Sequence, residues 1–387
     1  MPIINSLAEY ADDIAHWRRD LHRNPELLYD LERTAGIVAE KLREFGCDEV
    51  VEGIGRTGVV GVVKGREEGE TVIGLRADMD ALPIQEETGK PWASEVPGRM
   101  HACGHDGHTA MLLGAARYLA QTRNFAGRAV LIFQPAEEGG AGARAMIEDG
   151  LMERFGIVEV YGMHNMPGLP VGQFGIRSGP LMAAADHFSI QIEGKGGHAA
   201  KPHQGVDPVL VGTEIVGALQ SIVARNVDPL KNAVVSVTTF HAGDAFNVTP
   251  QRATLTGTVR TLEPGIRDLV ERRMSEMIPA IGAAFGATAR FTYKRNYPVT
   301  VNHAEQTEKA IEVARSVVGE KAVLTDNPPM MGGEDFSFML EARPGAFIFV
   351  GNGDSAGLHH PAYDFNDSAI PYGASYWASL VERLMPA

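Results

Sequence analysis

The sequence is poor in cysteine and has no long hydrophobic run. Only 2 of its 387 residues are cysteine, which excludes a disulfide-stabilised secreted scaffold and makes the cytoplasm the expected location. No apolar run approaches the roughly 18 to 20 residues that span a bilayer, so no membrane association is expected. Residues 1–13 are polar and acidic, which is typical of neither a signal peptide nor a transit peptide.

Positive charge is also scarce. Lys and Arg number 35 against 49 Asp and Glu, a formal net charge of -14. A chain this acidic is a poor candidate for binding a phosphate backbone, so no nucleic-acid partner is expected. Hydrophobic residues make up 44%, which is enough to bury a sizeable core and excludes a disordered chain. The sequence shows no repeat and no low-complexity tract.

Two stretches of the chain predict an α/β domain. At roughly 150 residues per domain, a chain of this length predicts two or three domains. Short, mostly unalternating apolar runs at 58–63, 71–75, 130–133 and 158–163 are typical of strands buried on both faces. Helical patterns precede, separate and follow them, at 8–23, 32–45, 107–121, 141–149, 305–317 and 369–384, with a further apolar strand at 347–350. We therefore expect a mixed, mostly parallel sheet covered by helices.

The middle of the chain predicts a different domain. Phe188, Ile190 and Ile192 alternate with polar residues, and the segments 209–223, 234–240, 254–259, 266–285 and 287–293 follow as helix, strand, strand, helix and strand. This β-α-β-β-α-β order is the ferredoxin-like arrangement. We therefore predict an α+β domain at 181–296, inserted into an α/β domain formed by 1–180 and 297–387.

The densest cluster of polar residues is M-H-A-C-G-H-D-G-H at 100–108. Cys103 and His105 are two apart, which places both side chains on one side of an extended segment. Thiolate and imidazole are good ligands for zinc and neighbouring metals. Asp106 could orient an imidazole through its ring N–H, and His101 and His108 could do the same or cap the following helix. The alternative is a histidine-rich helix cap without metal.

Three further motifs follow apolar strands. In Q-P-A-E-E-G at 134–139, Glu137 and Glu138 come just past a strand end, where open α/β sheets bind ligands. Adjacent carboxylates point in different directions, so one could bind metal while the other acts as a base. The alternative is an acidic helix N-terminus. His164 in G-M-H-N and His359 in L-H-H-P also come at strand ends or in loops after them.

Other polar residues lie in turns. Asp78 and Asp80 follow a strand and share one side when extended, so either could hold a metal or a ligand, although Asp and Pro also favour plain turns. His198 lies in a glycine-rich turn without a Walker or dinucleotide-binding pattern, and Asn247 in a similar loop. The acidic pair in G-G-E-D-F at 332–336 could be another element at the rim of a site. Cys47 is expected in the core.

Five motifs together resemble a known family. D-M-D-A-L-P at 78–83, H-A-C-G-H-D-G-H at 101–108, Q-P-A-E-E-G, G-M-H-N and L-H-H-P-A-Y-D-F-N-D at 358–367 occur in the order seen in zinc-type amidohydrolases with two co-catalytic metals. That family includes aminoacylases and glutamate-releasing carboxypeptidases. The cysteine resembles the branch of hippurate hydrolases, bacterial N-acyl-amino-acid amidohydrolases and plant auxin-conjugate hydrolases. The resemblance covers essentially the whole chain.

The resemblance implies a role for each matching residue. It implies two divalent ions, zinc, manganese, cobalt or nickel, held by Cys103, His105, Glu138, His164 and His359, with the Cys103 thiolate as the bridge. Glu137 would be the general base, and His198 would help to stabilise the oxyanion, often across a dimer interface. Asn247 and Arg260 are candidates for the substrate carboxylate. Asp80 would orient a metal ligand, while Asp78 stands where other branches have a histidine and receives no role.

The implied activity is hydrolysis of the amide bond of an N-acyl-amino acid. The inserted domain would serve as lid and dimerisation domain, giving a homodimer or a dimer of dimers. One alternative is a dipeptidase or carboxypeptidase of the same family, which would use the same residues. Another is a non-catalytic metal-binding regulator, which would have no need for Glu137 beside Glu138. The wide spread from Cys103 to His359 disfavours a structural zinc site.

Overall fold

The computed structural model describes residues 3–387. The chain divides into two compact units. The first comprises 1–179, 301–328 and 335–387, and the second comprises 180–300 and 329–334. The predicted insertion at 181–296 ends four residues earlier than the second unit's main segment, and the sequence pattern did not predict that 329–334 joins this unit.

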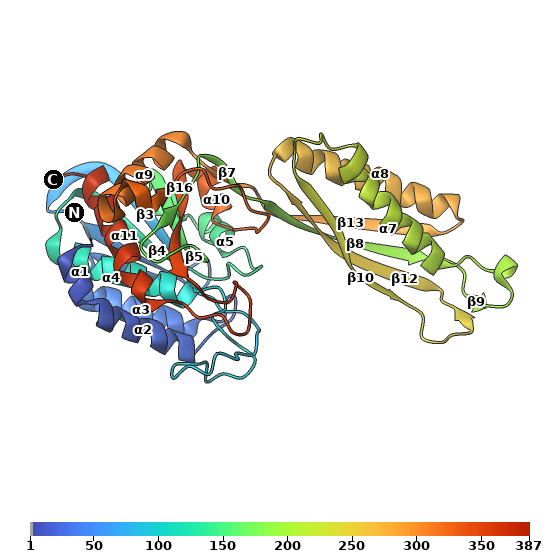
Figure 1. Cartoon of the computed structure of the whole chain (residues 1–387), viewed down its shortest axis with the longest axis horizontal. Coiled ribbons are helices and arrows are strands. Elements are labelled where there is room, and N and C mark those ends of the chain that lie inside the picture. The colour runs from blue at the N-terminus through green and yellow to red at the C-terminus, as the bar shows by residue number, and fades with distance from the viewer. Residues whose placement is uncertain (1–2) are drawn as a thin grey trace. The chain divides into compact units, whose positions relative to one another are not determined.

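The first unit is a three-layer α/β arrangement (Figure 1). Its helices are α1 (Asn5–Glu9), α2 (Ala11–Arg23), α3 (Glu32–Phe45), α4 (His105–Thr122), α5 (Gly142–Glu148), α6 (Leu151–Phe155), α9 (Ala304–Val318), α10 (Ser337–Ala342) and α11 (Ile370–Leu384). Its strands are β1 (Glu49–Ile54), β2 (Gly58–Lys64), β3 (Glu67–Asp78), β4 (Ala126–Gln134), β5 (Glu159–Pro167), β6 (Phe174–Gly175), β15 (Val323–Leu324) and β16 (Gly345–Gly353).

The strands of this unit form one mixed sheet of eight strands in the order β1-β2-β4-β3-β5-β16-β6-β15. The four central strands, β4, β3, β5 and β16, run parallel. Strands β1 and β2 pair antiparallel with their neighbours, and β6 pairs antiparallel with β16 but parallel with β15. The mixed α/β fold expected from the sequence is therefore confirmed. The central strands are buried along most of their length, because helices cover both faces of a parallel sheet. This is why they appear in the sequence as unbroken apolar runs.

The second unit is an antiparallel sheet with two helices on one face (Figure 1). Its main elements follow one another as β8 (Ala184–Glu193), α7 (Pro208–Arg225), β10 (Ala233–Ala242), β12 (Arg252–Thr261), α8 (Pro264–Ala284) and β13 (Thr288–Tyr297), and the sheet order is β10-β12-β8-β13. Two short strands, β9 (Gly197–His198) and β11 (Val248–Thr249), pair with each other. Burial alternates residue by residue along β8 and β12, as expected for a sheet with one open face. Strands β7 (Gly179–Met182) and β14 (Thr300–Asn302) lie where the chain passes between the two units.

Helix α7 has an unusual surface. Among the described residues, it alone has the length and apolar composition of a membrane span, and about a third of it is buried. Its buried residues Val211, Ile215 and Leu219 recur every four positions and pack on the sheet. Leu210, on another face, remains 48% exposed.

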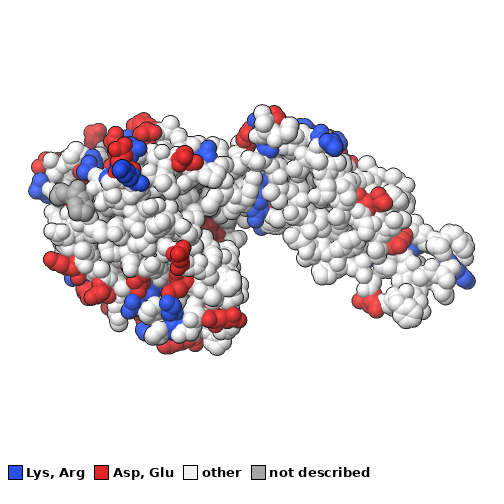
Figure 2. Space-filling model, in the orientation of Figure 1, with Lys and Arg blue, Asp and Glu red and all other residues white. Residues whose placement is uncertain are grey.

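Charged side chains of both signs share the surface. Figure 2 shows Lys and Arg lying beside Asp and Glu on the drawn face. Ion pairs of this kind include Arg43 with Glu52 and Arg295 with Asp268. Together with the net charge of -14, this mixed surface does not favour a polyanionic partner.

Candidate metal centre

The candidate site lies where the four parallel strands end. Because β4, β3, β5 and β16 are adjacent, their carboxyl ends meet at one edge of the sheet, the usual position for a ligand site. The predicted metal ligands come from this edge: Cys103 and His105 at the start of α4, Glu138 after β4, His164 in β5 and His359 after β16.

Gly104 allows the chain to turn sharply from Cys103 into α4. Its φ is 88°, a conformation that favours glycine, and a Cβ there would lie 2.2 Å from Asn165 Nδ2. Asn165 Nδ2 donates to the carbonyl oxygen of Cys103 at 2.6 Å, and the Tyr363 hydroxyl donates to Asn165 Oδ1 at 2.7 Å. This packing fixes the backbone that carries Cys103.

Cys103, His105 and His164 form one group of possible metal ligands. One ligand atom from each lies within 4.8 Å of the others, and Cys103 Sγ is 3.3 Å from His164 Nε2. His164 Nδ1 must carry the proton, because it lies 2.7 Å from the carbonyl oxygen of Asn165, which can only accept. The Nε2 lone pair of His164 therefore faces Cys103, as metal coordination requires.

Cys103 also belongs to a second group, with Glu138 and His359. Glu138 Oε1 and His359 Nε2 are 3.3 Å apart. The backbone N–H of His359 donates to the carbonyl oxygen of Ala102 at 2.8 Å, and His359 has a φ of 63°. Such a left-handed conformation is uncommon outside glycine and frequent at functional sites. Cys103 is therefore common to both groups.

The donor atoms fit divalent metal ions. Within the described part of the chain, both ring nitrogens of His105 and Oε1 of Glu138 are buried without a hydrogen-bond partner. Buried polar atoms nearly always have partners, so a cluster of unpaired ones calls for a missing ligand. A thiolate, three imidazoles and a carboxylate suit zinc, manganese, cobalt and nickel.

The protonation of the metal-free site reflects its many carboxylates. Burial lowers the pKa of His105, but the negative charges of Asp78, Asp80 and Glu138 outweigh it and raise this pKa to about 10. Burial, followed by repulsion from Glu138 and Glu137, raises the pKa of the Cys103 thiol. A cation bound here would displace protons from both side chains.

Asp80 connects His105 to the two glutamates. Its Oδ1 lies 3.4 Å from His105 Nδ1. Its carboxylate also accepts the backbone N–H groups of Glu137 and Glu138, at 3.0 and 3.1 Å. The turn that presents these two residues includes Ala136 with a φ of 54°. Asp80 therefore holds the glutamate turn and lies beside the ring of His105.

Asp78 and His108 satisfy each other and neighbouring groups. The backbone N–H of Asn165 donates to His108 Nε2 at 2.9 Å, so the proton of His108 resides on Nδ1, which donates to Asp78 Oδ1 at 2.6 Å. Burial lowers the pKa of His108, which favours this neutral form. The second oxygen of Asp78 accepts Arg76 at 2.8 Å. With both ring nitrogens engaged, His108 is not placed to bind metal.

Asp106 contacts an imidazole, as the sequence suggested, but not that of the candidate ligand His105. Its Oδ2 instead accepts His22 Nδ1 at 2.9 Å and Arg18 Nη1 at 3.2 Å, all three side chains being buried. The reason is helical geometry: successive residues at the start of α4 point in directions about 100° apart. His101 is also buried, and burial lowers its pKa to about 3.

Glu137 lies beside the donor atoms. A carboxylate oxygen of Glu137 lies within 4.8 Å of ligand atoms of His105 and Glu138. Its side chain is largely buried, and its Oε1 accepts the backbone N–H of Asp335 at 3.4 Å. Asp335 lies in the G-G-E-D-F motif at 332–336, which the sequence predicted only as an element at the rim of a site. The sequence signal that could have identified Asp335 is Arg76. An arginine inside a buried apolar strand needs acidic partners, and Asp335 is one of them.

The remaining predicted residues lie in the second unit. His198 is exposed in β9, and the Asn247 carbonyl oxygen accepts the backbone N–H of Ala199 at 3.1 Å. These two candidates therefore share one tip of the unit. Arg260 lies eight residues along β12 from Arg252, at the opposite end of the sheet, about 25 Å away. Within one chain, Arg260 and Asn247 therefore cannot hold the same carboxylate.

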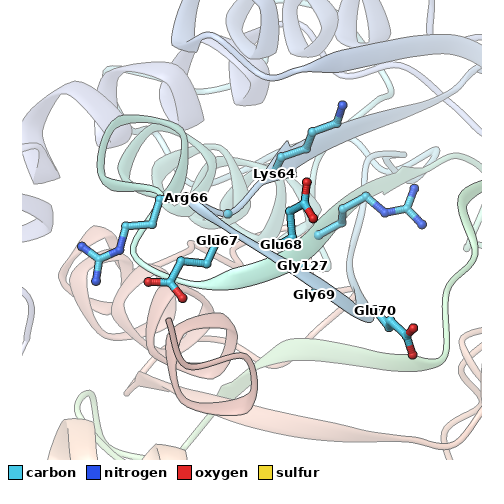
Figure 3. Close-up of a pocket in the computed structure, with 9 residues that line it drawn as sticks. Lys64, Arg66, Glu67, Glu68, Gly69, Glu70 and Gly127 are labelled. Atoms are coloured by element: carbon cyan, nitrogen blue, oxygen red, sulfur yellow. The ribbon is translucent and has the colours of Figure 1, made fainter.

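A separate pocket lies at the other end of β3 (Figure 3). Residues 64–70 line it together with Gly127 and Arg128. β3 is 12 residues long and ends at Asp78, so this pocket is on the order of 30 Å from the donor cluster. Lys64, Arg66 and Glu68 give its wall charges of both signs, without the buried unpaired atoms of the candidate metal centre.

Comparison with known proteins agrees with this geometry. The model of peptidase family M20/M25/M40 matches residues 74–383. The chain is 45% identical to a hippurate hydrolase from Campylobacter jejuni over 385 residues, covering 100% of each. It is 42% identical to thermostable carboxypeptidase 2 from Saccharolobus solfataricus over 352 residues, 90% of this chain and 88% of the relative.

A solved structure is also similar over its whole length. The YXEP protein from Bacillus subtilis, described as a dinuclear metal binding peptidase, superimposes with a TM-score of 0.84 at 38% identity, covering 98% of this chain and 99% of that one. These matches confirm the resemblance carried by the five motifs. The chain is a hydrolase that belongs to peptidase family M20/M25/M40.

Proposed function

We propose that the protein hydrolyses the amide bond of N-acyl-amino acids, releasing a carboxylic acid and an amino acid. The observation that carries the proposal is the meeting of Cys103, His105, Glu138, His164 and His359 at one sheet edge with Glu137 beside them. The full-length similarity to a hippurate hydrolase supports this substrate class. A cytoplasmic location remains part of the proposal.

Two divalent ions would be held by the two donor groups that share Cys103. When bound, they would lower the pKa of a coordinated water toward about 7 and polarise the substrate carbonyl. His164 presents Nε2 because the carbonyl oxygen of Asn165 holds its Nδ1, and the carboxylate of Asp80 lies beside the ring of His105. These contacts keep the donor atoms in place before any ion binds.

Glu137 would act as the general base. It would take a proton from the attacking water as the new C–O bond forms and give that proton to the amine nitrogen as the C–N bond breaks. Its position beside His105 and Glu138, without assignment to either donor group with Cys103, suits this role. General acid–base catalysis of this kind contributes on the order of 10² to 10⁴ in rate.

His198 and Asn247 would bind the substrate from the second unit, acting as a lid. His198 would donate to the developing oxyanion, and the Asn247 side chain would contact the free carboxylate. Their shared position at one tip supports their acting together. Arg260 lies too far along the sheet to assist Asn247 in the same chain.

The second unit would also mediate a dimer. Strand β10 is at the edge of its sheet, where unpaired backbone groups favour pairing with another strand. The neighbouring helix α7 exposes Val209 and Leu210. An exposed edge beside an apolar helix face is a suitable interface for a second copy of the chain.

The decisive experiment combines metal analysis with a substrate panel. The purified protein should contain divalent metal and should hydrolyse N-benzoylglycine and N-acetylmethionine. Glu137→Gln should reduce kcat by about 10² to 10⁴ while metal content stays unchanged, because the amide keeps the size of the side chain but cannot take a proton. Lys64→Gln, in the distant pocket, is the control and should retain parental kcat. Near-parental kcat in Glu137→Gln would refute the base assignment.

A second candidate is a carboxypeptidase or dipeptidase. The similarity to a Saccharolobus carboxypeptidase favours it, and the same donor atoms and base would serve. Dipeptides and N-blocked dipeptides in the same panel separate the two. A kcat/KM for a dipeptide above that for every N-acyl-amino acid would replace the first proposal with the second.

A further inference from the structure

We propose that Asp335, held in place by Arg76 and Gln134, is a positioning residue for Glu137. The inference rests on the proposed function, since it concerns the base of that reaction. Arg76, in β3, is fully buried, and its Nε donates to Gln134 Oε1 at 2.8 Å, its Nη1 to Asp78 at 2.8 Å and its Nη2 to Asp335 Oδ1 at 3.1 Å.

Both carboxylate oxygens of Asp335 accept hydrogen bonds. Its Oδ1 accepts Arg76 and, at 2.8 Å, the Gln134 amide, while its Oδ2 accepts the backbone N–H of Ala143 at 2.9 Å. Hydrogen bonds to a buried charged acceptor are strong and directional. The Asp335 side chain is therefore anchored to β3, β4 and the first turn of α5.

This anchor extends to Glu137 through the backbone. The N–H of Asp335 points at Glu137 Oε1 with an N···O distance of 3.4 Å. Catalytic hydrogen bonds are often long without substrate and shorten when it binds. Because the Asp335 side chain is fixed, its N–H cannot follow a rotating carboxylate, so the bond selects one orientation of Glu137.

The guanidinium of Arg76 thus contacts residues next to the metal-ligand cluster and next to the general base. Arg76 donates to Asp78, which accepts His108 Nδ1, and also to Asp335, whose backbone N–H contacts Glu137. Removing the guanidinium would take a positive charge away from two buried carboxylates, which is costly. The geometry therefore assigns to Arg76 the role of holding Glu137 in a fixed position relative to the metal-ligand atoms.

The primary variant is Asp335→Asn, which keeps the size but removes one acceptor oxygen and the charge. We expect kcat to fall about 10- to 100-fold with KM changed less than about threefold and metal content unchanged, because misplacement of a reacting group by a fraction of an ångström acts on the chemical step. Arg76→Lys should retain more kcat than Arg76→Met, since lysine restores the charge without the three-way geometry.

Two measurements separate positioning from a general structural role. In the Glu137→Gln background, Asp335→Asn should change the residual rate less than about twofold, because the two residues act as a unit. Hydrogen exchange of the Asp335 amide should accelerate in Glu137→Ala, a readout that needs no activity. Asp186→Asn is the matched control: Asp186 is a buried aspartate of the second unit that accepts Arg267 and the Tyr293 hydroxyl, and its loss should lower stability but leave kcat within about twofold.

The inference and the proposed function can fail separately. A parental kcat in Asp335→Asn, loss of its metal, or unchanged exchange of the Asp335 amide in Glu137→Ala would overturn the inference. If the parent hydrolyses no member of the substrate panel, the proposed function fails, while the exchange measurement still decides whether Asp335 holds Glu137.

Discussion

At the residue scale, Cys103 is the residue shared by the donor group with His105 and His164 and the donor group with Glu138 and His359. Cys103→Ala should therefore weaken binding of both ions, whereas His359→Ala should weaken only one. Metal titration followed by elemental analysis of the dialysed variants measures this difference. Equal metal loss in the two variants would contradict the bridging role of the thiolate.

His22 is a second residue whose chemistry the structure reveals. Burial alone lowers its pKa, but attraction to Asp106 and hydrogen bonds to Asp106 and Glu86 outweigh this and raise the pKa to about 9, against opposition from Arg18. The ring of His101 also faces it, with centroids 6.2 Å apart, and is neutral near pH 7. His22 is therefore charged in the folded protein at neutral pH.

This charge predicts a pH-dependent contribution to stability. A histidine whose folded pKa exceeds its unfolded value stabilises the fold fully below about pH 6.5, and the stabilisation is lost as the pH rises through about 9. The difference in unfolding free energy between the parent and His22→Gln should shrink by up to about 3 kcal/mol from pH 6 to pH 10. Urea unfolding at both values measures it. His16, exposed on the same helix, is the control position for a His→Gln change.

At the element scale, helix α4 packs unusually close to its neighbours at Gly107. A Cβ there would lie 2.2 Å from the ring of Phe365, whereas a Cβ at Gly36, within α3, meets nothing within 4 Å. Gly107→Ala should therefore lower the unfolding free energy by about 1 to 3 kcal/mol through overpacking. Gly36→Ala should raise it by about 0.5 to 1 kcal/mol, since alanine favours a helix.

The two glycine variants form a matched pair in one unit. Denaturant unfolding followed by circular dichroism measures both. If Gly107→Ala stabilises the protein as much as Gly36→Ala, the close approach of α4 and Phe365 is not present in solution.

The sequence patterns could predict those site residues that lie at the ends of strands. Glu138 and His164 come at the ends of buried apolar runs, and parallel strands bring such ends together whatever their separation in sequence. Sequence patterns could not tell which imidazole Asp106 would contact, because that depends on the direction of a side chain within a helical turn. Asp335 was different again, since its partner Arg76 lies 259 residues away.

At the scale of the whole molecule, the proposed role of His198 allows two arrangements, in which this residue serves the site of its own chain or the site of a partner copy. Mixing variants distinguishes the two. If His198 serves the partner's site in a dimer, mixing inactive His198→Ala with inactive Glu137→Gln should restore up to about a quarter of parental activity. The reason is that half the chains pair with the other variant, and each mixed pair then contains one complete site.

The control for this experiment is mixing after chemical cross-linking of each variant dimer. Activity should return only when subunits can exchange, which sedimentation of differently tagged chains monitors. Absence of activity despite demonstrated exchange would show that His198 serves its own chain.

The sequence by itself determined the fold class, the family and the set of metal-binding residue types, because periodicity and local motifs record which faces are buried and which side chains are available. Only the tertiary structure decided that His108 has both ring nitrogens engaged, that Asp106 serves His22 rather than His105, and that Asp335 reaches Glu137. Those contacts join residues far apart in the chain, and their distances and angles depend on how the helices and strands pack, which no local pattern encodes.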